Sequence, residues 1–108
     1  MKEKSLLVSF IGEAPIFKIV DFLIENKGTD MSKKQIIEGA EISRASLFNY
    51  WEQLEMQGIV CITRKFGNTK LYTLNSKSEI VKKLLELESV LISRALDKHN
   101  KKLVEVCS

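Results

Sequence analysis

The hydrophobic pattern of this chain changes its period at Gly58 and changes back after Asn75. Before Gly58, apolar residues recur every three or four positions, which is typical of amphipathic helices. Residues 59–63 are instead rich in β-branched side chains, and a second extended run, residues 69–74, follows Gly67-Asn68. Two short extended runs joined at Gly-Asn predict a β-hairpin. The expected fold class is therefore mainly α with one small hairpin.

Two helices are predicted in the first 40 residues. Pro15 suits the first turn of one helix, which ends at Asn26-Lys27-Gly28. Ser32 and Gln35 have the spacing of a capping box that opens a second helix of about two turns, with Gly39 at its end. The preceding residues 1–12 fit either a short strand or a helical lead-in.

A third helix is predicted from about residue 44 to 57, with Ser43 as its N-cap. Gly58 ends it. The apolar residues on or near one face are Leu47, Phe48, Trp51, Leu54 and Met56. We expect Phe48 and Trp51 to lie in the core.

A long helix is predicted after the hairpin, from about residue 77 to 98, and Ser76 with Glu79 has capping-box spacing. The tail after Asn100 is uncertain, although Leu103-Val104 could extend the helix. The apolar stripe of this helix includes Ile80, Leu84, Leu87, Leu91 and Ile92.

The composition excludes several classes of protein. A chain of 108 residues with 44% hydrophobic residues and one Pro suits a single folded domain and is neither disordered nor collagen-like. No apolar run approaches the roughly 18–20 residues that span a bilayer, and the N-terminus lacks a signal-peptide cleavage site. Cys61 and Cys107 suggest no disulfide scaffold, and we expect Cys61 to be buried in a strand. A cytoplasmic protein fits best.

Catalytic chemistry has few candidate residues in this sequence. His99 is the only histidine, and with two scattered cysteines it makes a poor metal site. The glycines form no phosphate-binding loop. Ser43 and Ser46 have no evident base beside them. We therefore expect no enzyme, no metal and no cofactor.

The order helix, short helix, turn, helix, hairpin resembles the winged helix-turn-helix transcription regulators of the broad MarR- and ArsR-like group, most of all small archaeal members. The residues that carry the resemblance are 31–36, 40–47, the junction Leu54 to Val60, and 64–74. It implies a winged DNA-binding domain over residues 1–75 and a C-terminal helix, residues 76–108, that serves dimerisation. The cysteine-rich metal motif of ArsR-like sensors is absent, and no small-molecule effector is evident.

The resemblance implies that the helix at about 43–57 enters the major groove of DNA. Arg44 can pair with guanine, Asn49 with adenine, and Ala45 can touch a thymine methyl. Serine hydroxyls at the helix start can donate to phosphates. The full set of expected DNA contacts is Lys33, Lys34, Ser43, Arg44, Ala45, Ser46, Asn49, Tyr50, Arg64, Lys65, Asn68 and Lys70. An ordinary solvated surface role remains open for Lys33, Lys34, Arg44 and Asn49. Ser43 can serve as both helix cap and DNA contact, and Tyr50 could instead lie partly in the core.

The charge distribution supports this interpretation better than the net charge of +3 does. Residues 56–78 hold four basic residues and no acid, whereas residues 1–55 hold seven basic and nine acidic residues. The predicted wing, residues 64–70, is therefore basic and suits the DNA backbone or minor groove.

The sequence predicts a homodimer formed through the last helix, with Leu84, Leu87, Leu91 and Ile92 at the interface. The same stripe could instead fold back on its own chain, above all near Ile80 and Leu84. The predicted function is a sequence-specific, dimeric transcription regulator that binds double-stranded DNA. The alternatives are an architectural or plasmid-partition DNA-binding protein, or a winged helix that binds only other proteins.

Overall fold

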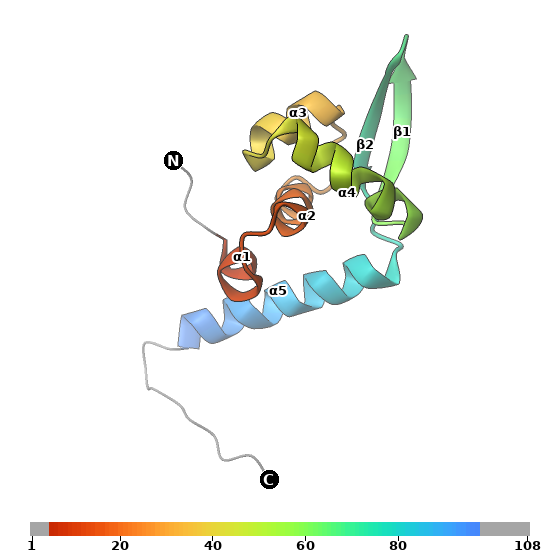
Figure 1. Cartoon of the computed structure of the whole chain (residues 1–108). Coiled ribbons are helices and arrows are strands. Elements are labelled where there is room, and N and C mark those ends of the chain that lie inside the picture. The colour runs from red at the N-terminus through yellow and green to blue at the C-terminus, as the bar shows by residue number, and fades with distance from the viewer. Residues whose placement is uncertain (1–4, 98–108) are drawn as a thin grey trace.

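The computed structural model describes residues 5–97. Their elements, in chain order, are α1 (Leu6–Ile11), α2 (Pro15–Glu25), α3 (Lys33–Ala40), α4 (Arg44–Met56), β1 (Val60–Phe66), β2 (Thr69–Leu74) and α5 (Glu79–Asp97). Figure 1 shows α2, α3 and α4 gathered in the middle, the hairpin rising on one side and α5 running beneath α1 and α2. Within the described residues, no helix is long and apolar enough to cross a membrane.

The N-terminal segment forms the helix α1. Its sequence allowed either a short strand or a helix, and the structure shows the helix. The Ser5 hydroxyl accepts from the Val8 N–H at 3.0 Å and donates to the Asp21 carboxylate at 2.8 Å. The same hydroxyl therefore caps α1 and ties it to α2, where Asp21 is buried. Pro15 stands in the first turn of α2 as expected.

α3 and α4 form a helix-turn-helix. The capping box at the start of α3 is confirmed, with both Ser32–Gln35 hydrogen bonds present. α3 does not end at Gly39: it continues to Ala40, and Glu41 turns the chain in the left-handed region at φ 56°. Gly39 instead allows close packing, because a Cβ there would collide with the Phe22 ring of α2. Ser43 caps α4 by accepting from the Ser46 N–H at 3.0 Å.

β1 and β2 pair as the predicted antiparallel hairpin around Gly67, whose φ of 58° suits a two-residue hairpin turn. The register slips by one residue between Ile62 and Arg64, which makes Thr63 the extra residue of a β-bulge. At the base of the hairpin, Met31 and Tyr72 exchange two backbone hydrogen bonds of 2.8 Å. This bridge fastens the loop between α2 and α3 to the wing.

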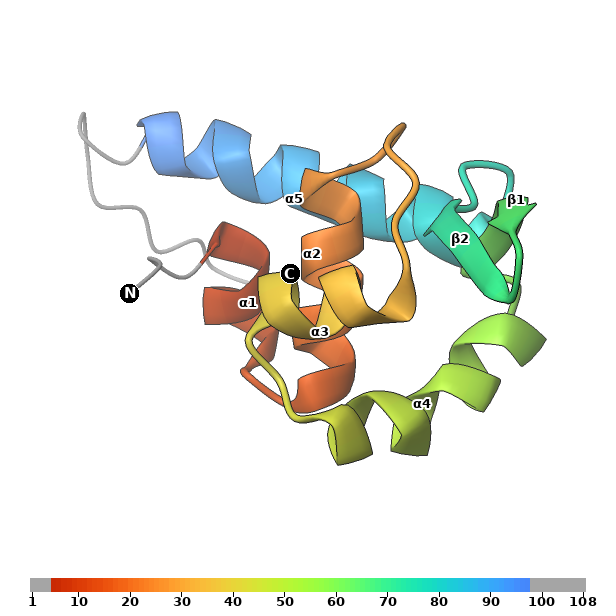
Figure 2. The same cartoon turned by 90° about the horizontal axis from the view of Figure 1, so that it is seen from above.

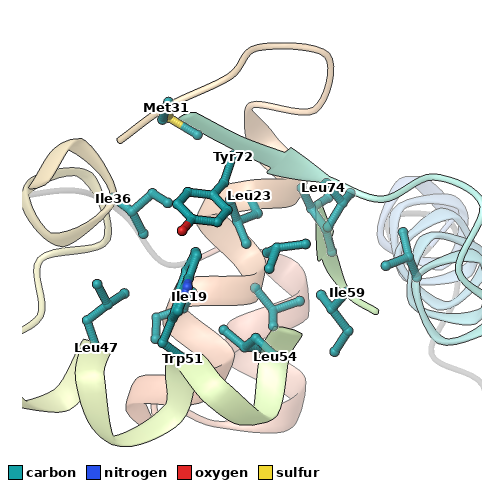
Figure 3. Packing of buried hydrophobic residues seen from close by; sticks show 14 of the residues in the cluster. Ile19, Leu23, Met31, Ile36, Leu47, Trp51, Leu54, Ile59, Tyr72 and Leu74 are labelled. Carbon is teal, nitrogen blue, oxygen red and sulfur yellow. The ribbon is translucent and has the colours of Figure 1, made fainter. Parts of the chain in front are cut away.

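The core lies where α2, α3, α4 and the base of the hairpin meet. The fully buried side chains include Ile19 and Leu23 of α2, Ile36 of α3, and Leu47 and Leu54 of α4. Figure 3 shows Tyr72 extending from the hairpin to Trp51 of α4, and the two rings meet edge to face with centroids 4.8 Å apart. The core therefore fixes the wing against α4.

The long helix α5 begins later than its sequence suggested. Ser78, not Ser76, supplies the cap, accepting from the Val81 N–H at 3.3 Å. Val81 is fully buried in the core, and α5 packs along α1, as Figure 2 shows from above. The predicted end of the helix at residue 98 and its extension through Leu103-Val104 lie outside the described residues.

The expected burial of Cys61 was wrong. Cys61 is exposed, because the hairpin rises clear of the helices and every residue from Cys61 to Lys70 is exposed. Met56 is 79% exposed, because α4 turns it away from the buried face that holds Trp51 and Leu54. The predicted fold class is otherwise confirmed: the chain is mainly helical, winged-helix-like, and has a long C-terminal helix.

Candidate nucleic-acid interface

α4 presents a small, polar face away from the core. Arg44, Ala45 and Asn49 are exposed, and Ser46 and Tyr50 are half-buried. Ser46 is occupied in part by the cap, since the Ser43 hydroxyl also donates to the Ser46 oxygen at 3.0 Å. The predicted DNA-contacting residues of this helix are thus accessible to differing degrees, with Arg44, Ala45 and Asn49 the most open.

An open groove of about 530 Å³ lies between the start of α3, the first turns of α4 and the hairpin. It brings together cations that are far apart in the sequence, and no acidic side chain lines it. The lining residues are Ser32, Lys33, Lys34, Ile37, Arg44, Phe48, Asn68, Thr69, Lys70 and Tyr72. This groove therefore joins predicted site residues of the helix-turn-helix and the wing in one positive, concave surface.

Lys33 occupies an aromatic cage at this groove. Its ammonium lies 5.3 Å from the ring centroid of Phe48, 5.4 Å from that of Trp51 and 5.8 Å from that of Tyr72. Each distance is within the range of a cation–π interaction. The half-buried Lys33 is therefore a positioned charge that links α3 to α4 and the wing, rather than a mobile surface lysine.

Phe48 corrects a sequence expectation, because 48% of it is exposed where a core residue was expected. The helix turns its ring toward the groove, where the Arg44 guanidinium lies 5.1 Å from the ring centroid. The ring thus holds two cations in place at the surface. Trp51, by contrast, is 3% exposed, as expected for the core, and its Nε1 makes no hydrogen bond among the described residues.

Tyr72 supports this cage in its neutral form. Burial raises the pKa of its phenol above the ordinary value, and the Glu55 carboxylate adds to the rise. The ring therefore stays uncharged across the ordinary pH range. Lys70 and Tyr72 are two residues apart in β2, so their side chains lie on the same face of the hairpin, and both line the groove.

The wing carries its charges on two faces. Lys65 and Lys70 are directly opposite each other in the strand register. Like charges in that position repel, and an anion placed between them would relieve the repulsion. Neither lysine has an ion-pair partner among residues 5–97.

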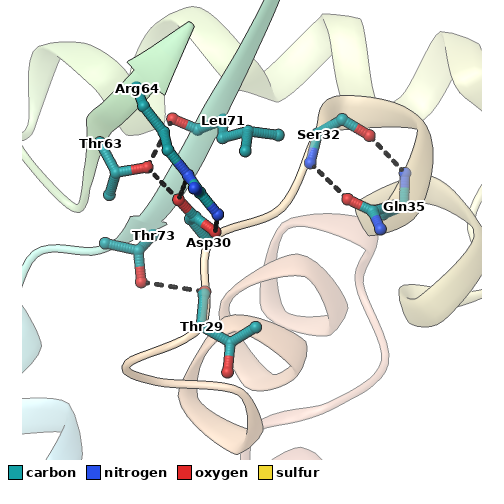
Figure 4. A network of polar contacts seen from close by, with 8 residues as sticks. All are labelled: Thr29, Asp30, Ser32, Gln35, Thr63, Arg64, Leu71 and Thr73. Carbon is teal, nitrogen blue, oxygen red and sulfur yellow. Dashed lines mark hydrogen bonds and ion pairs between the residues drawn. The ribbon is translucent and has the colours of Figure 1, made fainter. Parts of the chain in front are cut away.

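Arg64 is held on the other face of the wing by Asp30, a residue that no sequence pattern pointed to. Its Nε and Nη2 donate to the two Asp30 oxygens at 2.8 and 3.3 Å, and the Thr63 hydroxyl donates to the same carboxylate at 2.6 Å. These hydrogen bonds lower the pKa of Asp30, and the bond from Arg64 has the largest effect. Figure 4 shows this contact beside the bond from Thr73 to the Thr29 carbonyl. Arg64 therefore already has an anionic partner.

The described residues offer little other chemistry. They contain no group of three His, Cys, Asp or Glu side chains that could hold a metal ion. Cys61 has only a long contact of 3.8 Å to the Thr73 carbonyl. His99 and Cys107 lie outside the described part of the chain.

Comparisons with known proteins give a distant structural likeness. No protein-family model matches the chain, and no curated protein matches it. Among solved structures, the crystal structure of Sso10a-2, a DNA-binding protein from Sulfolobus solfataricus, is similar with 17% sequence identity and a TM-score of 0.48. The match covers 80% of this chain and 96% of the other.

Proposed function

We propose that this protein binds double-stranded DNA as a dimeric, sequence-specific transcription regulator. α4 would enter the major groove, and residues 64–70 would contact the backbone or the minor groove. The observation that carries the proposal is the acid-free groove in which Lys33, Lys34, Arg44 and Lys70 converge. Four cations on a concave surface beside an exposed helix face suit a phosphate backbone next to base edges.

Specificity would come from the open residues of α4. Arg44 can form a bidentate contact with guanine, and Asn49 can do the same with adenine. Because Arg44 already rests on Phe48, its guanidinium is partly ordered before binding. Ordering a side chain beforehand reduces the entropy lost on association.

Salt-dependent binding tests the DNA contact. If Lys33, Lys34, Lys65 and Lys70 each neutralise one phosphate while Arg44 contacts a base, log K against log salt should have a slope of about −3.6 per protomer. Fluorescence anisotropy with a labelled duplex measures this slope. Absence of affinity at low salt would overturn the proposal.

Selection of bound sequences from a random duplex pool tests specificity. A discrete motif with two-fold symmetry supports a regulator, whereas recovery without a motif and an extended footprint supports an architectural protein that coats DNA. Arg44→Ala should relax the selected motif. Lys27→Ala removes one exposed positive charge outside the groove lining and serves as the control.

The proposed division of the chain assigns residues 76–108 to dimerisation. Leu84, Leu87 and Leu91 are half-buried against the chain's own core, so only part of each could contact a partner. Ile92 is exposed, and Leu96, one turn later, is 70% exposed. Leu6 and Phe10 of the neighbouring α1 are exposed as well. A second copy would cover such apolar surface by two-fold symmetry.

Sedimentation equilibrium measures the oligomeric state directly. Ile92→Glu with Leu96→Glu should convert a dimer to a monomer, because the interface cannot bury two unpaired carboxylates. Ser93→Glu introduces a single carboxylate at an exposed polar position between them and should leave the dimer intact. A wild-type monomer at high concentration would refute this part of the proposal.

A further inference from the structure

The outer end of the wing carries a large apolar side chain that the core does not use. Phe66 is 59% exposed and pairs with Thr69 across the closing turn. The turn residues Gly67 and Asn68 are smaller, so Phe66 is the bulkiest side chain at the end of the hairpin. Its packing inside the chain does not account for a phenylalanine in this place.

The ring of Phe66 is nonetheless ordered by a neighbour. The Arg64 guanidinium lies 5.2 Å from the ring centroid, within cation–π range. Arg64 is itself held by an ion pair with Asp30. The two contacts, Asp30 with Arg64 and Arg64 with Phe66, therefore connect the loop before α3 to the end of the wing. The cation lies over the ring, and 59% of Phe66 stays exposed.

The surroundings of Phe66 suit a polyanion. Lys65 precedes it, and Lys70 is opposite Lys65, while the segment 56–78 contains no acidic residue. A narrow, exposed hairpin with positive charge around an apolar end is a shape that fits the minor groove of DNA. Proteins that bind there often insert an apolar wedge between two bases and bend the duplex.

We propose that Phe66 is such a wedge. It would enter the minor groove at a flexible pyrimidine–purine step and partly unstack it, while Lys65 and Lys70 contact the flanking phosphates. The duplex would bend away from the wedge, toward its major groove. This inference rests on the proposed DNA binding and adds a deformation of the DNA that α4 in the major groove does not require.

The preference for DNA sequence follows from the cost of deformation. Pyrimidine–purine steps such as TA unstack easily, whereas A-tracts are stiff. The wild-type protein should therefore bind a duplex with a central TA step more tightly than one with a central A-tract. This preference would arise at positions where no side chain reads a base edge.

Energy transfer between dyes at the two ends of a duplex of about 30 base pairs measures the bend. With the TA duplex, saturating wild-type protein should bend the DNA by an angle in the range of about 20–90°. Phe66→Ala should abolish most of the bend and bring the preference for TA over the A-tract toward one. Phe66→Leu should keep the bend, because leucine also serves as a wedge.

A second readout follows the base step itself. 2-Aminopurine beside the central step should brighten with wild-type protein and with Phe66→Leu, but not with Phe66→Ala. Lys65→Ala with Lys70→Ala should flatten the salt slope and still bend the duplex at saturation. Circular dichroism checks that each variant is folded, as expected for an exposed site.

Two results would overturn the inference: a wild-type protein that binds DNA without bending it, or a Phe66→Ala variant that bends it equally. A wild-type protein that binds no DNA would instead refute the proposed function, and the inference with it. The outcomes are separable because anisotropy reports binding and energy transfer reports bending.

Discussion

Five cations around the groove and the wing fall into two groups that differ in how the fold constrains their side chains. Lys33 lies in its aromatic cage, Arg44 makes a cation–π contact with Phe48, and Arg64 forms an ion pair with Asp30. Lys65 and Lys70 have no ion pair and no aromatic contact among residues 5–97. The first group has fixed positions, and the second is constrained by little except the strand.

This difference indicates two kinds of contribution to binding. A held cation has already lost side-chain freedom during folding, so it contributes geometry at little further entropic cost. A mobile lysine contributes mainly long-range attraction, which salt screens. We therefore expect substitutions in the first group to alter stability and selectivity, and those in the second to alter the salt slope.

The largest effect is expected at Trp51, which belongs to both the core and the cage. Trp51→Ala should lower the free energy of unfolding by about 3–5 kcal/mol, as for other buried aromatic side chains. Urea denaturation measures the change. Phe48→Ala, which removes an exposed wall of the same cage, is the matched control and should cost much less. An equal loss of unfolding free energy in the two variants would mean that Trp51 stabilises the fold more through the cage than through its packing in the core.

The second effect concerns the mobile pair. Lys65→Ala with Lys70→Ala should flatten the salt slope by about 1.8 per protomer, if each lysine neutralises one phosphate. It should also stabilise the fold slightly, because opposed like charges cost about 0.2–1 kcal/mol. Lys27→Ala with Lys82→Ala makes the same charge change on exposed positions outside the groove. An equal flattening by this control would show that net charge alone sets the slope.

The third effect distinguishes a held lysine from a mobile one. Lys33→Met keeps the aliphatic packing but loses the cation, and should lower stability by about 0.5–2 kcal/mol through lost cation–π attraction. Lys33→Arg retains a cation and should recover part of the loss. Thermal unfolding measures both variants. Unchanged stability of Lys33→Met would place Lys33 with the mobile group.

The smallest effect is expected at Asp30. The fold lowers the pKa of this carboxyl, so its contribution to stability is present above its unfolded pKa of about 3.9 and is lost as pH falls through the lower folded value. Asp30→Asn should remove this part of the acid dependence, which thermal melts between pH 5 and 2 would record. The variant should also release Arg64 and steepen the salt slope by up to about 0.9 per protomer. An unaltered slope would mean that Arg64 does not reach DNA.

Local signals in the sequence predicted the elements well. The change of period at Gly58 located the hairpin, and the Ser32–Gln35 spacing located the start of α3. The cap of α5 was misplaced because Ser76 and Ser78 are both suitable and only the fold around Asn75 chooses between them. Such local rules depend on residues a few positions apart, which the sequence displays directly.

Burial and pairing were harder to predict because they depend on distant segments. Phe48 has helical spacing with the core residues, but the place it faces is occupied by a lysine from α3 rather than by apolar side chains. Cys61 sits in a β-rich run, yet its side chain is exposed. Asp30 meets Arg64 across 34 positions of sequence, and no local pattern marks that contact.

The bulge at Thr63 has a consequence for how the wing could change length. Side chains of a regular strand alternate, so Thr63 and Arg64 would normally point in opposite directions, yet both donate to Asp30. The bulge thereby determines on which face of the hairpin each later side chain of β1 lies, including Phe66. Between the bulge and the turn, residues can be added or removed only two per strand if Lys65 and Phe66 are to keep their sides. The wing can therefore be lengthened or shortened by two residues in each strand without changing which face its outer side chains occupy. A change of one residue in each strand would move Lys65 and Phe66 to the opposite faces.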